Sequence, residues 1–461
     1  MKRVASLLIL LFAFTAQGQQ MAPPAGTSAA PPQAHPGANP QFLQAADDVL
    51  AEMSDILHLP IKAPLKKSLR SKEEIRAYLV REEKEDRTDA QRYADAKSLE
   101  AFGLIPKGFP LDAFMLDVLT DQVAGLYDPK AKEFYIADWI PVEEQREVMS
   151  HELTHALEDQ SFDVEKWIKT ARPNDDAEMA RNAVSEGTAL AAMVDYALRD
   201  AKMSVRDIGD ISALLRAGAV AQMNQDPNLS KAPLYIRDGL LFPYLAGTTF
   251  SQQFLKAHTG WADLHLLFER PPVSTQQIMQ PDAYLKGVAP TKVALPDWKR
   301  AVPPDWKLLE ENVLGEFGLD EVLKQFGDDN SAEEVSSGWA GDRYALFEDA
   351  KAKSTPLVFL LALSTSDDAA GFFDRYSQAL ERKYKTRSQF FRRPGFFQFH
   401  TDNADVFLRC VESQCLTVEG ATRETFDEIN KAVHWTPAPI PGDAVSDGVA
   451  QLPAVPTFPS R

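Results

Sequence analysis

Apolar residues recur at intervals of three and four along much of the chain before residue 330, a spacing that places them on one face of a helix. Pro141 suits the first turn of one such stretch, where a missing N–H costs nothing, and Glu143 and Glu144 suit its positive end. The expected helices cover residues 41–57, 72–102, 113–119, 141–160 and 176–200.

Two short apolar runs between the third and fourth of these helices predict a β-hairpin. Its strands cover residues 123–127 and 133–137, joined by a turn rich in Asp, Pro and Lys. Helices and irregular segments follow up to about residue 326. We therefore expect an N-terminal helical segment over residues 41–110 and a mainly helical unit with a small sheet over residues 111–330.

The pattern changes after residue 330, where strand-like runs alternate with helical ones. This alternation predicts a separate C-terminal α+β domain over residues 331–435, so the fold class of the whole chain is α+β. The expected strands cover residues 344–347, 356–363, 396–400, 406–411 and 415–418, and the expected helices cover residues 366–384 and 423–433.

The two ends of the chain differ from the rest. Residues 1–18 resemble a secretory signal peptide, with Lys2 and Arg3 before an apolar run that is short for a membrane span. Residues 19–40 and 436–461 are rich in Ala and Pro, which predicts disorder. The mature protein is expected to be secreted or periplasmic, without stable membrane insertion.

The composition of the chain argues against some classes of binding partner. The chain has 461 residues and a formal net charge of −18, which argues against nucleic acids and anionic membranes. For the same reason the aromatic and basic run at residues 390–399 is assigned to core packing. The two cysteines, Cys410 and Cys415, can form a hairpin disulfide or remain thiols, and no second ligand pair supports a zinc site there.

The sequence His151-Glu152-Leu-Thr-His155 lies inside the helix expected over residues 141–160. Residues four apart share a helix face, so both imidazoles can reach one metal ion. Glu152 can act as a general base on a water at that ion. Because the chain has only eight histidines, chance rarely produces this H-E-x-x-H pattern. The motif predicts a catalytic Zn2+ site rather than a histidine pair in the core.

A catalytic zinc site needs a third protein ligand and an open position. Glu158 and Ser161 stand where one class of zinc peptidases has a glycine and a third histidine, which excludes that class. Glu186 is the preferred ligand, because small residues around it let its helix approach the histidines closely. The less favoured candidates are Glu178, Asp175 and Asp195.

This motif with a downstream helical glutamate resembles the gluzincin branch of zinc metallopeptidases. Glu186-Gly-Thr-Ala189 resembles the compact members of that branch, whereas Leu190 replaces the aspartate of the thermolysin-like pattern. The chain also resembles an uncharacterised group of secreted bacterial metallopeptidase-like proteins over about residues 110–350. The resembling segments are residues 123–129, 241–244, 271–278 and 338–344.

The resemblance implies a zincin-like fold in which zinc binds His151, His155 and Glu186, and Glu152 is the general base. It also implies that residues 133–137 form the sheet edge on which an extended substrate pairs. We therefore expect a secreted zinc metallopeptidase that hydrolyses a peptide or protein substrate. A zinc peptidase also needs a group that stabilises the oxyanion formed when water attacks the substrate carbonyl. The candidates are Tyr196, Tyr235, Tyr244 and two histidines expected on one helix face, His258 and His265. The candidates for orienting His151 are Asp159 and Asn182.

A second hypothesis is a non-enzymatic exported binding protein, in which a zincin scaffold keeps a structural metal. Glu152 favours the enzyme, because a structural site needs ligands but no base. A further hypothesis is that the N-terminal segment covers the cleft and inhibits the enzyme. The sequence leaves the cleavage preference, the role of the C-terminal domain and the oligomeric state open.

Overall fold

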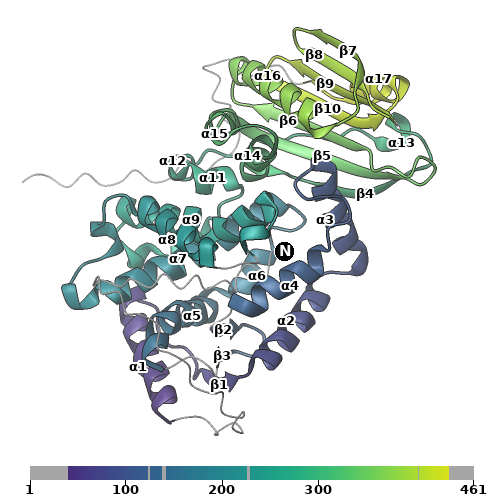
Figure 1. Ribbon diagram of the computed structural model, residues 1–461. Coiled ribbons are helices and arrows are strands. Elements are labelled where there is room, and N and C mark those ends of the chain that lie inside the picture. The colour runs from purple at the N-terminus through teal and green to yellow at the C-terminus, as the bar shows by residue number, and fades with distance from the viewer. Residues whose placement is uncertain (1–39, 123–124, 138–141, 226–228, 403, 436–461) are drawn as a thin grey trace, which may run out of the picture.

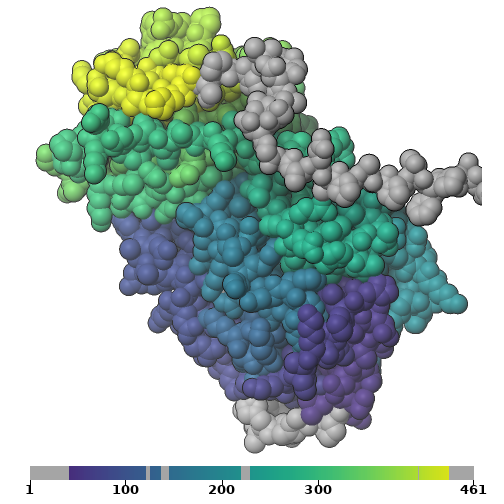
Figure 2. Space-filling view, turned by 180° about the vertical axis from the view of Figure 1, so that it is seen from behind, coloured from purple at the N-terminus to yellow at the C-terminus, as the bar shows by residue number. Residues whose placement is uncertain are grey.

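The computed structural model describes residues 40–435, apart from residues 123–124, 138–141, 226–228 and 403. The predicted signal peptide, linker and tail lie outside the described residues, except that Pro40 begins the first helix. The fold is α+β, as expected: a helical body with a three-stranded sheet joins a lobe built on a seven-stranded sheet (Figure 1). The first helix and this C-terminal lobe lie at opposite ends of the molecule (Figure 2).

The N-terminal segment contains three helices and one strand, and a fourth helix follows it directly. The single helix expected over residues 72–102 is in fact two helices, because Thr88 caps a new one. The Thr88 hydroxyl accepts the backbone N–H of Gln91, and the Gln91 side chain accepts the backbone N–H of Thr88. The elements are α1 (Pro40–Leu57), β1 (Lys66–Arg70), α2 (Lys72–Asp86), α3 (Asp89–Phe102) and α4 (Leu111–Gln122).

The small sheet has the strand order β1-β3-β2, where β2 is Gly125–Asp128 and β3 is Glu133–Ala137. β3 pairs with β1 in parallel on one side and with β2 in antiparallel on the other. The expectation that residues 133–137 form the sheet edge is therefore wrong. The unpredicted strand β1 covers that side of β3, and β2 is the outer strand that contacts α5 (Val142–Phe162).

The central helix of the body is α7 (Asp175–Leu198), which packs between α5 and α9 (Leu234–Ala257). Its residues are buried on every side over most of its length, which its many small residues allow. Within the described ranges, no helix combines the length and the apolar character needed to cross a membrane. The other helices of the body are α6 (Val164–Lys169), α8 (Ile211–Gln225), α10 (His265–Glu269), α11 (Thr275–Met279) and α12 (Pro281–Leu285).

The C-terminal sheet has the order β4-β5-β6-β10-β9-β8-β7, and all neighbours are antiparallel. It begins at residue 306, ahead of the boundary expected at residue 331. The sequence pattern missed β4, which is charged and half exposed, and β7, which is exposed throughout. The strands are β4 (Trp306–Asn312), β5 (Trp339–Asp349), β6 (Leu357–Leu363), β7 (Ser388–Arg393), β8 (Phe396–His400), β9 (Asp405–Val411) and β10 (Gln414–Ala421).

Helices cover both faces of this sheet (Figure 1). Along β6, Phe359 and Leu361 join the core on the α16 side, whereas Val358 and Leu360 join the core on the α17 side. This two-sided burial explains why β6 is apolar without alternation. The helices of the lobe are α13 (Trp298–Ala301), α14 (Gly315–Phe326), α15 (Asp329–Ser336), α16 (Ser366–Lys383) and α17 (Arg423–Ala432).

Two open expectations about the lobe are resolved. Cys410 and Cys415 are direct neighbours across β9 and β10 and form a disulfide. The assignment of residues 390–399 to the core holds for the aromatic residues of β8, which are buried. It is wrong for Phe390 and Phe391 on β7, which are 51% and 49% exposed, because β7 is the last strand of the sheet.

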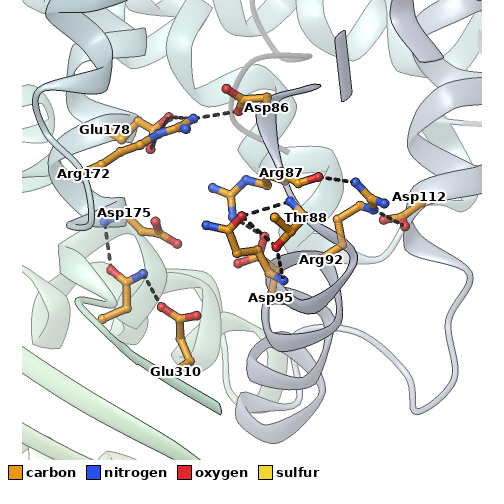
Figure 3. Close-up of polar contacts among 12 residues, drawn as sticks. Asp86, Arg87, Thr88, Arg92, Asp95, Asp112, Arg172, Asp175, Glu178 and Glu310 are labelled. Atoms are coloured by element: carbon orange, nitrogen blue, oxygen red, sulfur yellow. Dashed lines mark hydrogen bonds and ion pairs between the residues drawn. The ribbon is translucent and has the colours of Figure 1, made fainter. Parts of the chain in front are cut away.

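Hydrogen bonds join the C-terminal lobe to the start of α7. Asp176 accepts both the backbone N–H of Thr275 at 3.0 Å and its hydroxyl at 2.5 Å, and the hydroxyl of Thr275 accepts the N–H of Phe317 on α14 at 3.1 Å. Figure 3 shows Asp175 beside this junction, where its backbone N–H donates to the Asn312 side chain at 2.9 Å. The N-terminal end of α7 is therefore fixed to the lobe.

Candidate metal centre

The three side chains predicted as metal ligands lie together where α5 faces α7. His151 and His155 are one turn apart on α5, and Glu186 projects from α7. The two Nε2 atoms are 3.1 Å apart, and Glu186 Oε2 lies 3.2 Å from His151 Nε2 and 3.5 Å from His155 Nε2. Two helices thus bring together groups that are 35 residues apart in sequence.

These separations fit one small cation. Zinc binds imidazole nitrogen at about 2.0–2.1 Å in tetrahedral sites, which places neighbouring ligand atoms about 3.3 Å apart. Calcium and magnesium prefer oxygen ligands, so two imidazoles favour zinc or another transition metal. The donor set matches a site with three protein ligands.

The burial of Glu186 and His151 affects the protonation of Glu186. Burial alone raises the pKa of Glu186, but His155 and His151 outweigh it and lower that pKa to about 2. Glu186 Oε1 is buried and accepts no hydrogen bond from the described residues. A buried, ionised oxygen without a partner is costly, and a cation held by the three groups would compensate it.

Glu152, the predicted general base, lies beside the three ligands and is also buried. Its Oε2 accepts the backbone N–H of Tyr127 on β2 at 2.8 Å, while its Oε1 is buried and has no hydrogen-bond partner in the described part of the chain. Burial raises the pKa of Glu152 to about 8, although the nearby charge of His155 opposes this. One carboxylate oxygen is thus anchored and the other is available to accept a proton.

Three further residues near His155 were given no role in the site from the sequence: Ser185, Glu158 and Thr188. Ser185 Oγ lies 3.4 Å from His155 Nδ1, and Glu158 accepts the hydroxyl of Thr188 at 2.7 Å. Glu158 follows His155 by three residues, and this spacing was the available sequence signal, because it places both on one helix face. The backbone N–H of Tyr127 leaves no such signal.

The less favoured ligand candidates lie elsewhere. Glu178 is buried and forms an ion pair with the partly exposed Arg172, whose Nη2 donates to it at 2.9 Å (Figure 3). Asp175 begins α7 at the junction with the lobe, and Asp195 near the other end of α7 accepts the N–H of residue 205. Of these four carboxylates, Glu186 alone joins the histidine pair.

Among the oxyanion candidates, Tyr244 stacks on His151, with ring centroids 6.3 Å apart and 29° between the planes. His258 follows the end of α9 and His265 begins α10, so the expectation that both share one helix is wrong. Two candidates lie in other parts of the body: Tyr196 near the C-terminal end of α7, and Tyr235 in a cavity beside α3.

The candidates for orienting His151 have other positions. Asp159 lies two turns beyond His151 on α5 and accepts the hydroxyl of Tyr127 at 2.8 Å and the ammonium of Lys132 at 2.5 Å. It therefore ties α5 to the β2–β3 hairpin rather than to the histidine. Asn182 is buried on α7, one turn before the glutamate ligand candidate.

Comparison with known proteins concerns the lobe. A family model described as a domain of unknown function (DUF8575) matches residues 307–430, from β4 to α17. The match does not include α5 and α7, which carry the candidate metal centre. No curated protein and no solved structure matches the chain.

Proposed function

We propose that this protein is a zinc-dependent metallopeptidase, with His151, His155 and Glu186 as the zinc ligands. The observation that carries the proposal is the 3.1–3.5 Å spacing of the three ligand atoms, with the anchored carboxylate of Glu152 at their side. The proposal includes a zincin-like body, in which a small sheet precedes the helix with the histidine pair. It also includes export to a secreted or periplasmic location, on the basis of residues 1–18.

Each group has a separate role in this proposal. Bound zinc would supply a Lewis acid that polarises the substrate carbonyl and lowers the pKa of water. Glu152 takes a proton from the attacking water as the new C–O bond forms, and delivers it to the leaving nitrogen as the C–N bond breaks. The N–H of Tyr127 holds Oε2, so that the carboxylate keeps its place while Oε1 exchanges the proton.

The corrected strand order moves the proposed substrate position from β3 to β2. β3 is enclosed by β1 and β2, whereas β2 is one of the two outer strands of the sheet and contacts α5, which carries the histidine pair. An extended peptide that pairs with the outer side of β2 passes directly beside the general base, because Tyr127 on β2 contacts Glu152.

The binding-protein alternative remains the competing class. It gives Glu152 no role, although this residue is buried with an unpartnered oxygen beside the ligands. A structural metal site gains nothing from such a carboxylate, whose burial is costly. The cost of burying Glu152 therefore favours the enzyme hypothesis over the binding-protein hypothesis.

Cleavage of a peptide library, read by mass spectrometry, tests the proposal. Zinc-loaded protein should cut, and Glu152→Gln should lower kcat by a factor of about 10² to 10⁴ with its zinc content unchanged, because glutamine still accepts the N–H of Tyr127. Glu165→Gln on α6 is the matched control and should keep full activity. Equal cleavage by wild type and Glu152→Gln, or no cleavage by either, would contradict the proposal. Loss of zinc from Glu152→Gln would contradict the division of roles.

A further inference from the structure

The C-terminal lobe carries a basic segment in a strongly acidic protein. Residues 382–401 contain six lysines and arginines and no aspartate or glutamate, whereas the whole chain has a net charge of −18. The fold uses three of these cations: Lys383 pairs with Glu419, Arg382 donates to a backbone carbonyl of α14, and Arg392 pairs with Asp374 on α16 at 2.6 Å. The three cations that remain are exposed on or beside β7: Lys385, Arg387 and Arg393.

β7 is the last strand of the seven-stranded sheet (Figure 1). All six of its residues are exposed. Within the described ranges it pairs with β8 alone, so its outer side presents backbone N–H and C=O groups. Such an edge is a template for an added strand.

Two half-exposed rings flank this edge on opposite faces. Phe390 contacts Phe397 and Phe399, with centroids 6.5 and 5.7 Å apart, whereas Phe391 contacts Phe396 at 6.0 Å. Because side chains alternate between the faces of a strand, a strand added to β7 would cover one ring on each face. A platform for nucleic-acid bases would instead need its rings on a single face.

A groove with a volume of about 500 Å³ continues from the C-terminal end of β7. Arg392 and Arg393 border it on the β7 side. The wall on the α16 side includes Ala369, Ala370 and Phe373, and two acidic residues, Asp374 and Glu412, also line the groove. The guanidinium of Arg392 lies 5.2 Å from the ring centroid of Phe373. A polypeptide that runs along β7 would therefore end in a groove that combines an apolar wall with arginine and acidic side chains.

We propose that the outer edge of β7 binds an extended acidic segment of a partner polypeptide, which adds a strand to the C-terminal sheet. The backbone of β7 supplies pairing, and Lys385, Arg387 and Arg393 supply charge complementarity. The β7 of a second copy is excluded as occupant, because it would bring the same arginines against each other. This site is distinct from the proposed peptidase centre and does not depend on its activity.

Fluorescence anisotropy at low salt tests the site with full-length protein. The probe is a fluorescein-labelled peptide of about ten residues that alternates glutamate and valine, and its counterpart alternates lysine and valine. The acidic peptide should bind and the basic one should not. Arg387→Glu with Arg393→Glu should weaken binding by at least about tenfold, whereas the control Lys307→Glu with Lys353→Glu, at the opposite end of the sheet, should change it less than about twofold.

Two further probes separate strand addition from simple charge attraction. An acidic peptide with alternate backbone N-methyl groups cannot complete a strand ladder, so its affinity should fall by at least about tenfold. Equal binding of the N-methylated peptide, or no binding of the unmodified one, would overturn the proposal. Tighter binding of oligothymidylate or of phosphatidylglycerol vesicles, abolished by the same two arginine substitutions, would overturn it in favour of a nucleic acid or a membrane. Unchanged circular dichroism confirms that each variant is folded.

Discussion

A Cβ atom on Gly187 would lie 2.1 Å from the carbonyl carbon of Gly247, so α7 and α9 meet through their backbones at this point. Gly187 follows Glu186 directly on α7. Tyr244, which lies three residues before Gly247 on α9, stacks on His151. The close approach of the two glycines therefore sets the distance between α7, which carries Glu186, and α9, which carries the tyrosine that stacks on His151.

Gly187→Ala should separate α7 from α9. The clash is with backbone, which cannot rotate away, so we expect a loss of at least about 2 kcal/mol in the free energy of unfolding and a weaker zinc affinity. Urea unfolding and a chelator competition measure the two effects. Gly371→Ala on α16, where an added Cβ meets nothing within 4 Å, should be neutral or stabilising by up to about 1 kcal/mol. Equal stability of Gly187→Ala and wild type would contradict the tight contact.

Glu186→Gln should lose zinc while the protein stays folded. The neutral amide no longer balances the charge of the cation. Loss of a residue that only contacts a metal ligand lowers metal affinity roughly 10- to 100-fold, so loss of the ligand Glu186 should lower the zinc affinity by more than this. Zinc content after dialysis, measured by elemental analysis, checks this. Glu178→Gln is the comparison, because its carboxylate pairs with Arg172 and should leave zinc bound. The reverse result would make Glu178 the ligand.

The sequence predicts the candidate centre better than it predicts the strands around it. The spacing of His151 and His155 fixes both on one helix face, and small residues beside Glu186 indicate that its helix can approach closely. Both signals are local. The contact from Tyr127 to Glu152 depends on a backbone group of a neighbouring strand, which no side-chain pattern reveals.

The missed strands share a physical cause. β1 has the sequence Lys-Lys-Ser-Leu-Arg and β7 is fully exposed, so neither shows the alternation that marks a half-buried strand. Their pairing comes from tertiary contacts, such as the register of Leu69 with Ile136 on β3. The break between α2 and α3 is different, because the capping pair Thr88 and Gln91 was present in the sequence and marks the start of α3.

Removal of residues 1–70 should destabilise the protein rather than activate it. β1 pairs with the central strand β3, and α1 packs on α5 with Phe42, Val49 and Met53 buried. Each lost apolar side chain costs about 2 kcal/mol, so the truncated protein should unfold at a much lower temperature or aggregate. Removal of residues 1–38 is the control and should change little. A folded truncation with higher peptidase activity would instead support the inhibitory hypothesis.

The carboxylate of Asp342 should make the stability of the lobe depend on pH. It accepts the backbone N–H groups of Leu314 and Gly315 and the indole N–H of Trp339, each at 2.8 Å, yet burial raises its pKa from 3.8 to about 6. A raised pKa means that the folded state holds the proton more tightly, so the stabilisation is complete below pH 3.8 and is lost as the pH rises through 6, by about 3 kcal/mol. In urea unfolding, the difference in free energy between wild type and Asp342→Asn should therefore shift by this amount over the interval. A constant difference for Asp342→Asn would show that this carboxyl does not titrate there.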